Sequence, residues 1–346
     1  MSPLSPRCIT YFDCLRFLLA QTVVVGHGFG FFFGYWDGFF PSKAPYIQSI
    51  AVVGFFFVSG FLICRSAVAN IKYKGGDYVR YYVDRLSRVY TTLAPCLIFV
   101  FLVDLFFSYQ TSDFELGDNS AISTLFKNFL LLPSMPFGTM RPIWSLMFEW
   151  WIYILFGGVV FFRKNWIFSA ICIGVGGYYT FEVNAKGEAG HLEVIWMAGA
   201  IASVIFESIG RYAYSRYAAW VSLSFAIVIY LLTRDAYNIF AGLLFSCGLL
   251  FMAISFNCND AIISSKVSWY FNRLAGYSFT LFLTHYTVLY WLQKMGSSGL
   301  GGLFLALILA NITAFFIASF TEEYHKSVSR KILNVITSLR AIVIAR

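Results

Sequence analysis

The sequence predicts an all-α polytopic membrane protein with about ten transmembrane helices and both termini in the cytoplasm. Three observations support this prediction: the composition, a series of long apolar runs, and the distribution of lysine and arginine between those runs. Of the 346 residues, 59% are hydrophobic and only 12% are charged. The mean hydropathy of +0.71 is outside the range of water-soluble domains. Because little polar sequence remains between the apolar runs, we expect a single integral-membrane domain over residues 1–346.

Ten apolar runs are long enough to cross a membrane, since a helix needs about 20 residues to span a hydrocarbon core of about 30 Å. The fifth run is short, and the seventh and eighth are separated by only a few residues, so between about nine and eleven spans fit the same pattern. The N-terminal residues lack the layout of a signal peptide, and we expect the first run to remain in the protein. The ten runs are 11–33, 47–66, 88–109, 143–162, 166–182, 191–209, 217–233, 237–256, 274–293 and 300–321.

Lysine and arginine are concentrated in alternate connections between the runs. If the N-terminus is cytoplasmic, the inside connections include the richest basic segment, residues 65–90, and the basic tail after the last run. This asymmetry satisfies the positive-inside rule and predicts both ends of the chain in the cytoplasm. The same loops account for the net charge of +8, so we expect a lipid bilayer and no nucleic acid as the partner of this charge.

Two segments outside the apolar runs also have helical patterns. The longest outside connection, 110–142, contains the stretch LFKNFLLLP at 125–133, which predicts a short interfacial or re-entrant helix. The tail, 323–346, alternates basic and apolar residues at helical spacing and predicts an amphipathic cytoplasmic helix on the inner leaflet. The helical core is therefore expected over about residues 11–322.

The first run contains three ionisable residues, Asp13, Arg16 and His27. Each charge inside a bilayer costs about 2.5–3.5 kcal/mol on insertion scales, so such residues usually face the interior of a bundle. Arg16 and His27 are about three helical turns apart, which places them on one face with an axial separation of about 16 Å. Asp13 precedes Arg16 by one turn and lies near the same stripe. One face of the first helix is therefore predicted to be polar.

Glu149 lies in the fourth run at a predicted depth similar to that of His27, about 9 Å below the outer end of each helix. Equal depth permits a pair in which the carboxylate orients the imidazole and raises its basicity, as a general base requires. The alternative is that each side chain is satisfied by nearby hydroxyls such as that of Ser145 and takes part in no chemistry.

Arg85 and Arg88 lie on adjacent turns at the cytoplasmic start of the third run. Two guanidinium groups there are suited to bidentate binding of a phosphorylated ligand. The alternative is ordinary positive-inside topology, which also predicts basic residues at this position.

Further polar groups in the apolar runs are Ser59, Asp104, Glu207, Tyr277, Ser278 and His285. His285, near mid-membrane, either lines the same cavity as His27 or makes a helix-packing hydrogen bond. The two acidic residues have no evident partner. The seven cysteines show no ligand-like spacing, so we interpret them as core residues and expect no metal site.

Five sequence blocks follow one another along nearly the whole chain. They are FDCLR with Arg16, separated from His27 by ten residues; VVGFFFVSGFLICRS at 52–66; RLSRVY at 85–90; IWSLMFEWWIYIL at 143–155; and GYSFTLFLTH at 276–285. In this order they resemble the membrane acyltransferase 3 family, the integral-membrane O-acyltransferases of bacterial surface polysaccharides and related acceptors.

The resemblance implies about ten helices, a cytoplasmic acyl-CoA donor, and transfer to an acceptor on the far side of the bacterial cytoplasmic (inner) membrane. It implies that Arg16 and His27 are essential and that Arg85 and Arg88 contact the CoA. It also marks acidic residues matching Glu149 and one near the end of the last run, Glu322 or Glu323. The candidate supporting residues in and around the blocks are Asp13, Ser59, Trp144, Ser145, Tyr277, Ser278 and His285.

Three blocks depart from the usual family pattern. FFFVSGF lacks a leucine common before the serine, EWWIY replaces the more usual EEQFY, and RVYTTLAP lacks a proline commonly found close after the basic pair. These changes leave the helical core intact and leave donor and acceptor specificity open.

We therefore expect an acyl-CoA-dependent O-acyltransferase that acts on a hydroxyl of a glycan or lipid-linked saccharide. Acetyl-CoA is the first expected donor, although larger acyl groups fit equally, and no permanently bound cofactor is expected. The alternative is a secondary transporter or flippase for an anionic or glycan substrate, with the intramembrane charges as a proton relay. The paired broken helices and inverted repeats typical of transporters are not evident in the sequence.

Overall fold

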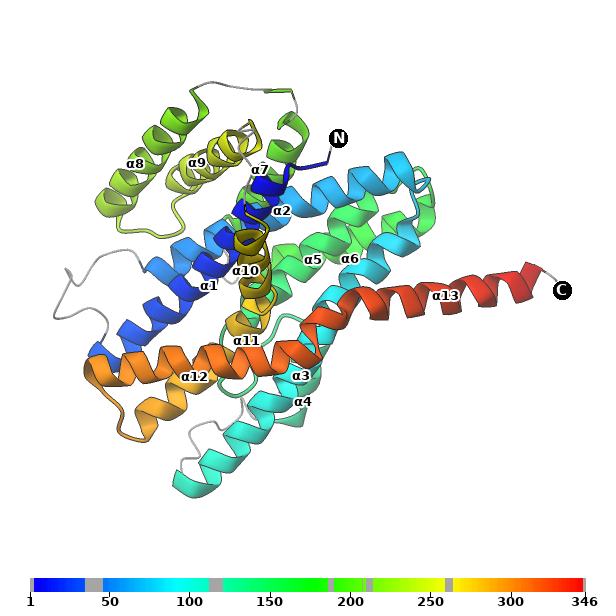
Figure 1. Ribbon diagram of the computed structural model, residues 1–346. Helices are drawn as coiled ribbons and strands as arrows, with labels where there is room; N and C mark the ends of the chain where they lie inside the picture. Colours follow the sequence, from blue (N-terminus) through cyan, green and yellow to red (C-terminus); the bar gives the residue numbers. More distant parts are fainter. Residues whose placement is uncertain are drawn as a thin grey trace. The chain divides into compact units, whose positions relative to one another are not determined.

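A computed structural model describes the chain except residues 1–2, 35–45, 112–120, 186–189, 207, 210–213, 259–263 and 345–346. Every regular element among the described residues is a helix (Figure 1), which confirms the predicted all-α class. The elements are α1 (Pro6–Phe33), α2 (Ile47–Tyr73), α3 (Tyr78–Thr111), α4 (Ile122–Phe129), α5 (Ile143–Val160), α6 (Trp166–Ala185), α7 (Leu192–Ile205), α8 (Ser215–Thr233), α9 (Ile239–Cys258), α10 (Ser265–Ala275), α11 (Ser278–Lys294), α12 (Gly299–Phe320), the short 3-10 helix η2 (Glu322–Tyr324) and α13 (His325–Ile344).

Each of the ten predicted apolar runs coincides with one of these helices. Eight segments of the described chain are long and apolar enough to cross a membrane: α1, α2, α3, α5, α6, α8, α9 and a stretch that begins with α12. The two other predicted runs form α7, which has 14 residues, and α11, which has 17. The protein is therefore a multi-pass membrane protein, while the number of crossings and the cytoplasmic position of the termini stay predictions.

The chain is divided into two compact units, each assembled from distant parts of the sequence. The first unit comprises Met1–Ala69, Val183–Ser278 and Val288–Asn311, and the second comprises Asn70–Glu182, Phe279–Thr287 and Ile312–Arg346. The proposed base His27 therefore belongs to the first unit, and the basic segment around Arg85 belongs to the second.

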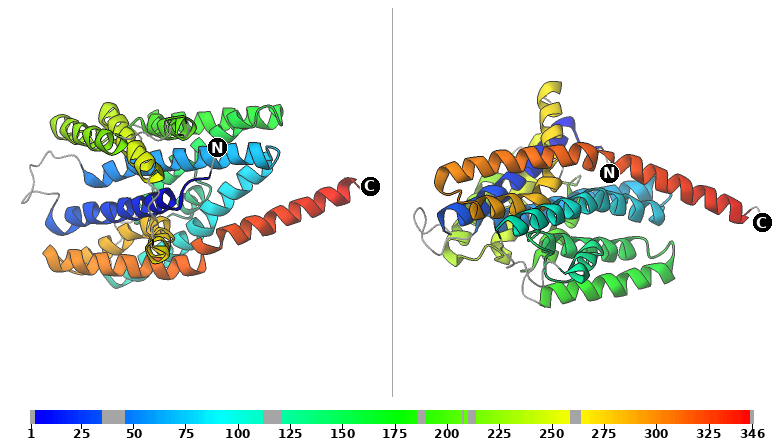
Figure 2. Two further views of the ribbon diagram at one scale, coloured as in Figure 1. Left: turned by 45° about the horizontal axis from the view of Figure 1, so that its top comes forward. Right: turned by 90° about the horizontal axis from the view of Figure 1, so that it is seen from below.

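In the first unit, α1 packs against α9 and α10, and α9 also packs against α7 and α8; Figure 2 shows α8 and α9 side by side. Two glycines allow α2 and α7 to cross closely. A β-carbon on Gly60 would lie 2.0 Å from the carbonyl oxygen of Trp196, and one on Gly199 would lie 2.2 Å from that of Phe57. Next to this crossing the Trp196 indole N–H donates to Ser59 Oγ at 3.1 Å. Ser59 therefore holds a helix crossing, as small and hydroxyl residues do in membrane bundles.

In the second unit, α3 packs against α4, α5, η2 and α13. The short helix predicted near 125–133 is present as α4, and the chain that follows it is buried at Leu131 and over residues 137–140. The Asn128 side chain, which is fully buried, donates to the carbonyls of Thr124 and Met135 and accepts from the backbone N–H of Phe137. This side chain therefore holds the loop between α4 and α5 in a fixed shape.

The predicted tail helix is present as α13, which follows α12 after the turn at η2 (Figure 2). One side of α13 lies against α3, where Ser329 is buried and its hydroxyl donates to Asp84. Val335 and Leu339 are exposed, at 59% and 57%. An exposed apolar surface is typical of helices that lie on a lipid bilayer. The exposed residues of α13 agree with the predicted position on the inner leaflet, which stays a prediction.

Candidate functional site

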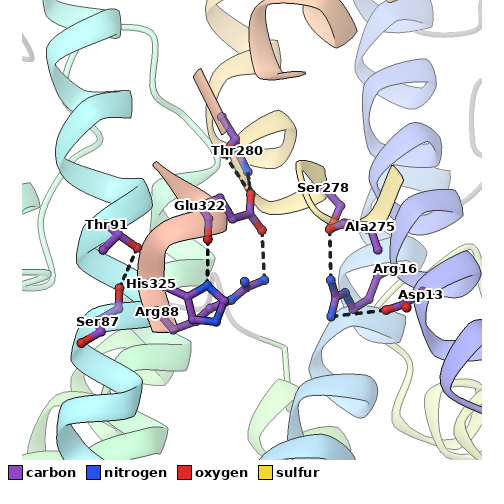
Figure 3. Close-up of polar contacts among 10 residues, drawn as sticks. All are labelled: Asp13, Arg16, Ser87, Arg88, Thr91, Ala275, Ser278, Thr280, Glu322 and His325. Atoms are coloured by element: carbon purple, nitrogen blue, oxygen red, sulfur yellow. Dashed lines mark hydrogen bonds and ion pairs between the residues drawn. The ribbon is translucent and has the colours of Figure 1, made fainter. Parts of the chain in front are cut away.

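Arg16 contacts the chain where α10 ends (Figure 3). Its Nη2 donates to the carbonyl oxygen of Ala275 at 3.0 Å, and Ser278 Oγ donates to the same oxygen at 2.8 Å. The last carbonyls of a helix have no partner within the helix and carry partial negative charge, so a cation there is favourable. In this structure Arg16 therefore acts as a cap on the C-terminus of α10.

Asp13 is buried next to Arg16 but is bonded to it only loosely. Asp13 Oδ1 lies 3.9 Å from Arg16 Nη1, and Asp13 Oδ2 accepts from Asn272 Nδ2 at 3.3 Å. The bond from Asn272 ties α1 to α10. The polar face predicted for α1 is thus in contact with protein groups at its N-terminal end.

His27 is partly buried on α1 between two glycines that other helices approach closely. A β-carbon on Gly26 would lie 2.5 Å from Oε1 of Gln48 in α2, and one on Gly28 would lie 2.5 Å from Cδ1 of Leu303 in α12. Larger residues at either position would force the Gln48 or Leu303 side chain to move. The glycines therefore let two neighbouring helices close around the imidazole.

A polar triad links α1 to α12 and the start of α11 in the first unit. Gln21 and Asn311 exchange two side-chain hydrogen bonds of 2.6 and 3.1 Å. The Tyr277 hydroxyl donates to Asn311 Oδ1 at 3.0 Å. These bonds satisfy amides that would otherwise be costly to bury in an apolar bundle, so Tyr277 has a packing role here.

Glu322 is the centre of a buried charged network in the second unit (Figure 3). Its carboxylate is 1% exposed and lies 3.0 Å from Nη2 of Arg88. The other oxygen accepts from the backbone N–H and the hydroxyl of Thr280 at 3.1 and 2.9 Å. Thr280 is in the first turn of α11, where free N–H groups favour an anion. Glu323, by contrast, is exposed, so the structure separates the two acidic residues that the sequence left as alternatives.

Basic residues surround this network, and we call Arg85, Arg88, His325 and Lys326 the basic cluster. His325 Nδ1 bonds to the carbonyl of Glu322 at 2.7 Å, and the charges of the other three residues act on its ring. Arg85 lies over the ring of Tyr81 at 6.0 Å, and among the described residues its buried Nε has no hydrogen-bond partner. Among the described residues, the cluster thus combines Arg88, whose charge is paired with Glu322, with Arg85, which forms no ion pair.

The α5 residues lie in the second unit as well. Ser145 Oγ donates to the carbonyl of Pro142 at 3.0 Å, so this hydroxyl is used at the start of its own helix. Trp144 and Glu149 are partly buried. Because Glu149 and His27 belong to different units, their pairing stays a prediction.

A family model described as an acyltransferase domain matches residues 9–321. The chain belongs to the membrane acyltransferase 3 family. Neither a curated protein nor a solved structure matches it. The family match covers nearly all of the chain, including all five blocks, Arg85 and Arg88. The protein is therefore a membrane acyltransferase.

In this acyltransferase His285 bonds to its own helix. Its Nδ1 lies 3.0 and 2.9 Å from the carbonyls of Leu281 and Phe282. A carbonyl can only accept, so Nδ1 carries the proton in these bonds. The bonds lie within α11 itself, and the two alternatives for His285, lining a cavity or bonding a neighbouring helix, stay predictions.

The acyltransferase also contains a carboxylate network that the sequence did not identify. Asp104 is 4% exposed and accepts from the backbone N–H and hydroxyl of Thr139 at 2.9 and 2.8 Å. Thr139 Oγ1 is also 2.8 Å from the hydroxyl of Thr287 in α11. Asp104 thus anchors the loop before α5 to α3. Glu207 lies outside the described residues.

No group of three or more His, Cys, Asp and Glu residues in the described part of the acyltransferase is arranged to hold a metal ion. The candidate chemistry rests on the imidazole of His27 in α1 and on the basic cluster, in which the buried carboxylate of Glu322 holds Arg88.

Proposed function

We propose that this acyltransferase moves an acyl group from cytoplasmic acyl-CoA to a hydroxyl of a glycan or lipid-linked saccharide on the outer side of the bacterial cytoplasmic membrane. The observation that carries the proposal is α1, in which a half-buried His27 lies about 16 Å along the helix from Arg16. A membrane acyltransferase needs a base recessed from bulk water, and two close-packed glycines give His27 such surroundings.

The reaction we propose is direct base-catalysed transfer. His27 removes the proton of the acceptor hydroxyl while the hydroxyl oxygen attacks the thioester carbonyl. The carbon–sulfur bond of the resulting tetrahedral intermediate breaks, and the leaving thiolate takes the proton back from the imidazolium. An ester and free CoA are formed, and His27 returns to its neutral state. A carboxylate such as Glu149 would stabilise the imidazolium and hold the ring in place.

We propose that the phosphates of the donor bind the basic cluster, chiefly through Arg85. Guanidinium groups bind phosphate oxygens with paired, charge-assisted hydrogen bonds. Arg88 shares its charge with Glu322 at 3.0 Å, so its role is to hold the cluster together as well as to meet the donor. The pantetheine arm would then extend along the face of α1 that carries Arg16 and His27.

The test is a His27→Ala variant assayed in membranes with acetyl-CoA labelled in the acetyl group. Loss of the base should lower transfer of label to the membrane glycan fraction by about 10²–10⁴-fold. His191→Ala is the matched control, because His191 is an exposed histidine at the start of α7. Both variants must reach wild-type amounts in the membrane. Normal transfer by His27→Ala would refute the proposed mechanism.

Two further readouts separate this function from transport and identify the substrates. An acyltransferase releases CoA when its acceptor is supplied, whereas a transporter with a proton relay releases none. Mass spectrometry of surface glycans from cells with and without the protein would give the mass of the transferred group and the sugar that carries it.

A further inference from the structure

Gln48 packs directly against α1 at the residue before His27. It lies in the first turn of α2, and its side chain and backbone both approach Gly26. A β-carbon on Gly26 would lie 2.5 Å from Gln48 Oε1 and 3.0 Å from the Gln48 backbone nitrogen. A β-carbon at position 26 would force this amide to move.

The direction of His27 follows from its two neighbours on the helix. Successive side chains of an α-helix are about 100° apart around the axis. A β-carbon on Gly26 would point toward Gln48. A β-carbon on Gly28 would lie 2.5 Å from Cδ1 of Leu303 and 3.3 Å from Cδ2 of Leu289. His27 projects between these two directions. The imidazole is therefore flanked by a polar amide on one side and by two leucines on the other.

The amide oxygen of Gln48 is buried and has no hydrogen-bond partner among the described residues. Buried polar atoms are nearly always bonded, and an exception in a native structure calls for an explanation such as a ligand or a water. By contrast, the partly buried amides of Gln21 in α1 and Asn311 in α12 satisfy each other. Gln48 is thus an amide left open beside the proposed base.

We propose that Gln48 binds the acceptor and selects for a polyhydroxy compound. Its Oε1 accepts a hydrogen bond from an acceptor hydroxyl adjacent to the hydroxyl that His27 deprotonates. A saccharide offers such neighbouring hydroxyls, and an alcohol with a single hydroxyl does not. This inference rests on the proposed acyl transfer and names the residue that recognises the acceptor in it. A site built to bond a substrate hydroxyl discriminates strongly against molecules that lack it.

The experiment compares Gln48→Met, which keeps the shape of the side chain, with Gln48→Glu, which keeps an oxygen acceptor. Label from acetyl-CoA is followed into a glycan and glycolipid extract from cells that lack this protein, with the extract and the donor titrated separately. Gln48→Met should raise the amount of extract needed for half-maximal rate by about tenfold or more and leave the KM for acetyl-CoA unchanged. Gln48→Glu should stay much closer to wild type.

The matched control is Gln293→Met, because Gln293 is an exposed glutamine of the same unit whose amide donates to the Phe31 carbonyl at 2.8 Å. It should leave the extract titration unchanged.

Three outcomes would overturn the inference. In the first, Gln48→Met titrates like the wild type. In the second, Gln48→Glu is more impaired than Gln48→Met, which would mean that the amide donates to the developing oxyanion. In the third, both variants fail to fold, which would mean a packing role. Absence of label transfer by the wild-type protein is a separate result, and it would refute the proposed function itself.

Discussion

Arg16 in α1 and Arg88 in α3 are both predicted to be needed for acyl transfer, yet the protein holds them in different ways. Arg16 bonds a neutral backbone carbonyl at 3.0 Å and lies 3.9 Å from Oδ1 of Asp13. Arg88 lies 3.0 Å from a carboxylate that is 1% exposed. If Arg16 is removed, the Ala275 carbonyl keeps the Ser278 hydroxyl. If Arg88 is removed, a buried charge loses its cation, so the two arginines report on different properties when they are mutated.

The largest effect is expected for Arg88→Ala. Breaking a buried ion pair by removing one partner leaves an uncompensated charge and typically costs 3–5 kcal/mol. Because Arg88 is itself 29% exposed, we expect about 3 kcal/mol, at the lower end of that range. Thermal unfolding of the protein purified in detergent, with size-exclusion profiles as a check on folding, measures the loss.

The double variant Arg88→Met with Glu322→Gln is the control for this prediction. It removes both charges and keeps similar side-chain volumes, so it should recover much of the stability lost by Arg88→Ala. Unchanged unfolding of Arg88→Ala would show that the pair contributes little, and its loss of activity could then be attributed to donor binding.

A smaller loss of stability and a large loss of activity are expected for Arg16→Ala. The variant loses one charge-assisted hydrogen bond, but the carbonyl stays satisfied, so the cost should be about 1 kcal/mol. Activity should nevertheless fall well below that of the wild type, because the proposed donor path follows the Arg16 face of α1. Unfolding curves and label transfer measured on the same preparation separate the two effects.

Arg16→Lys sharpens this comparison. Lysine keeps the charge at the end of α10 but lacks the planar fork of arginine. It should therefore keep wild-type stability and still lose activity. A variant that is folded and fully active would mean that Arg16 only caps α10.

Much of the fold could be predicted because each crossing helix requires a long apolar run. The ten runs all correspond to helices, including the short α7, and the pattern of the tail corresponds to α13. The division into two units could not be predicted, because it depends on which helices pack together. The crossing at Gly60 and Gly199 is one example: a glycine in an apolar run shows that a neighbour can come close, but not which neighbour it is.

The charged residues of the site could be predicted from the sequence, but the groups that they bond could not. Charged residues in an apolar run are conspicuous, so Arg16, His27 and Arg88 could be singled out. The partner of Arg16 is a backbone carbonyl, and Glu322 bonds a backbone amide. Backbone groups do not differ between residue types, so the sequence does not identify these partners. Gln48 is a neutral residue at the edge of a run, and only its burial against Gly26 makes it notable.

The smallest effect on stability is expected for Arg85→Ala, and this variant gives the cleaner test of donor binding. Its guanidinium forms no ion pair within the described part of the chain, although it lies in the same basic cluster as Arg88. Removing it therefore leaves no buried charge behind, and unfolding should be close to that of the wild type. Losing charge-assisted bonds to phosphate should raise the KM for acetyl-CoA by about tenfold and leave the maximal rate nearly unchanged.

Arg216→Ala is the matched control for Arg85→Ala, because Arg216 is an exposed arginine of α8 in the first unit. It should leave both stability and donor KM unchanged. If Arg85→Ala binds the donor normally, binding of the donor phosphates does not depend on the charge of Arg85. The basic segment would then act through membrane topology alone, and Arg88 would serve only as the cation that keeps Glu322 at the start of α11.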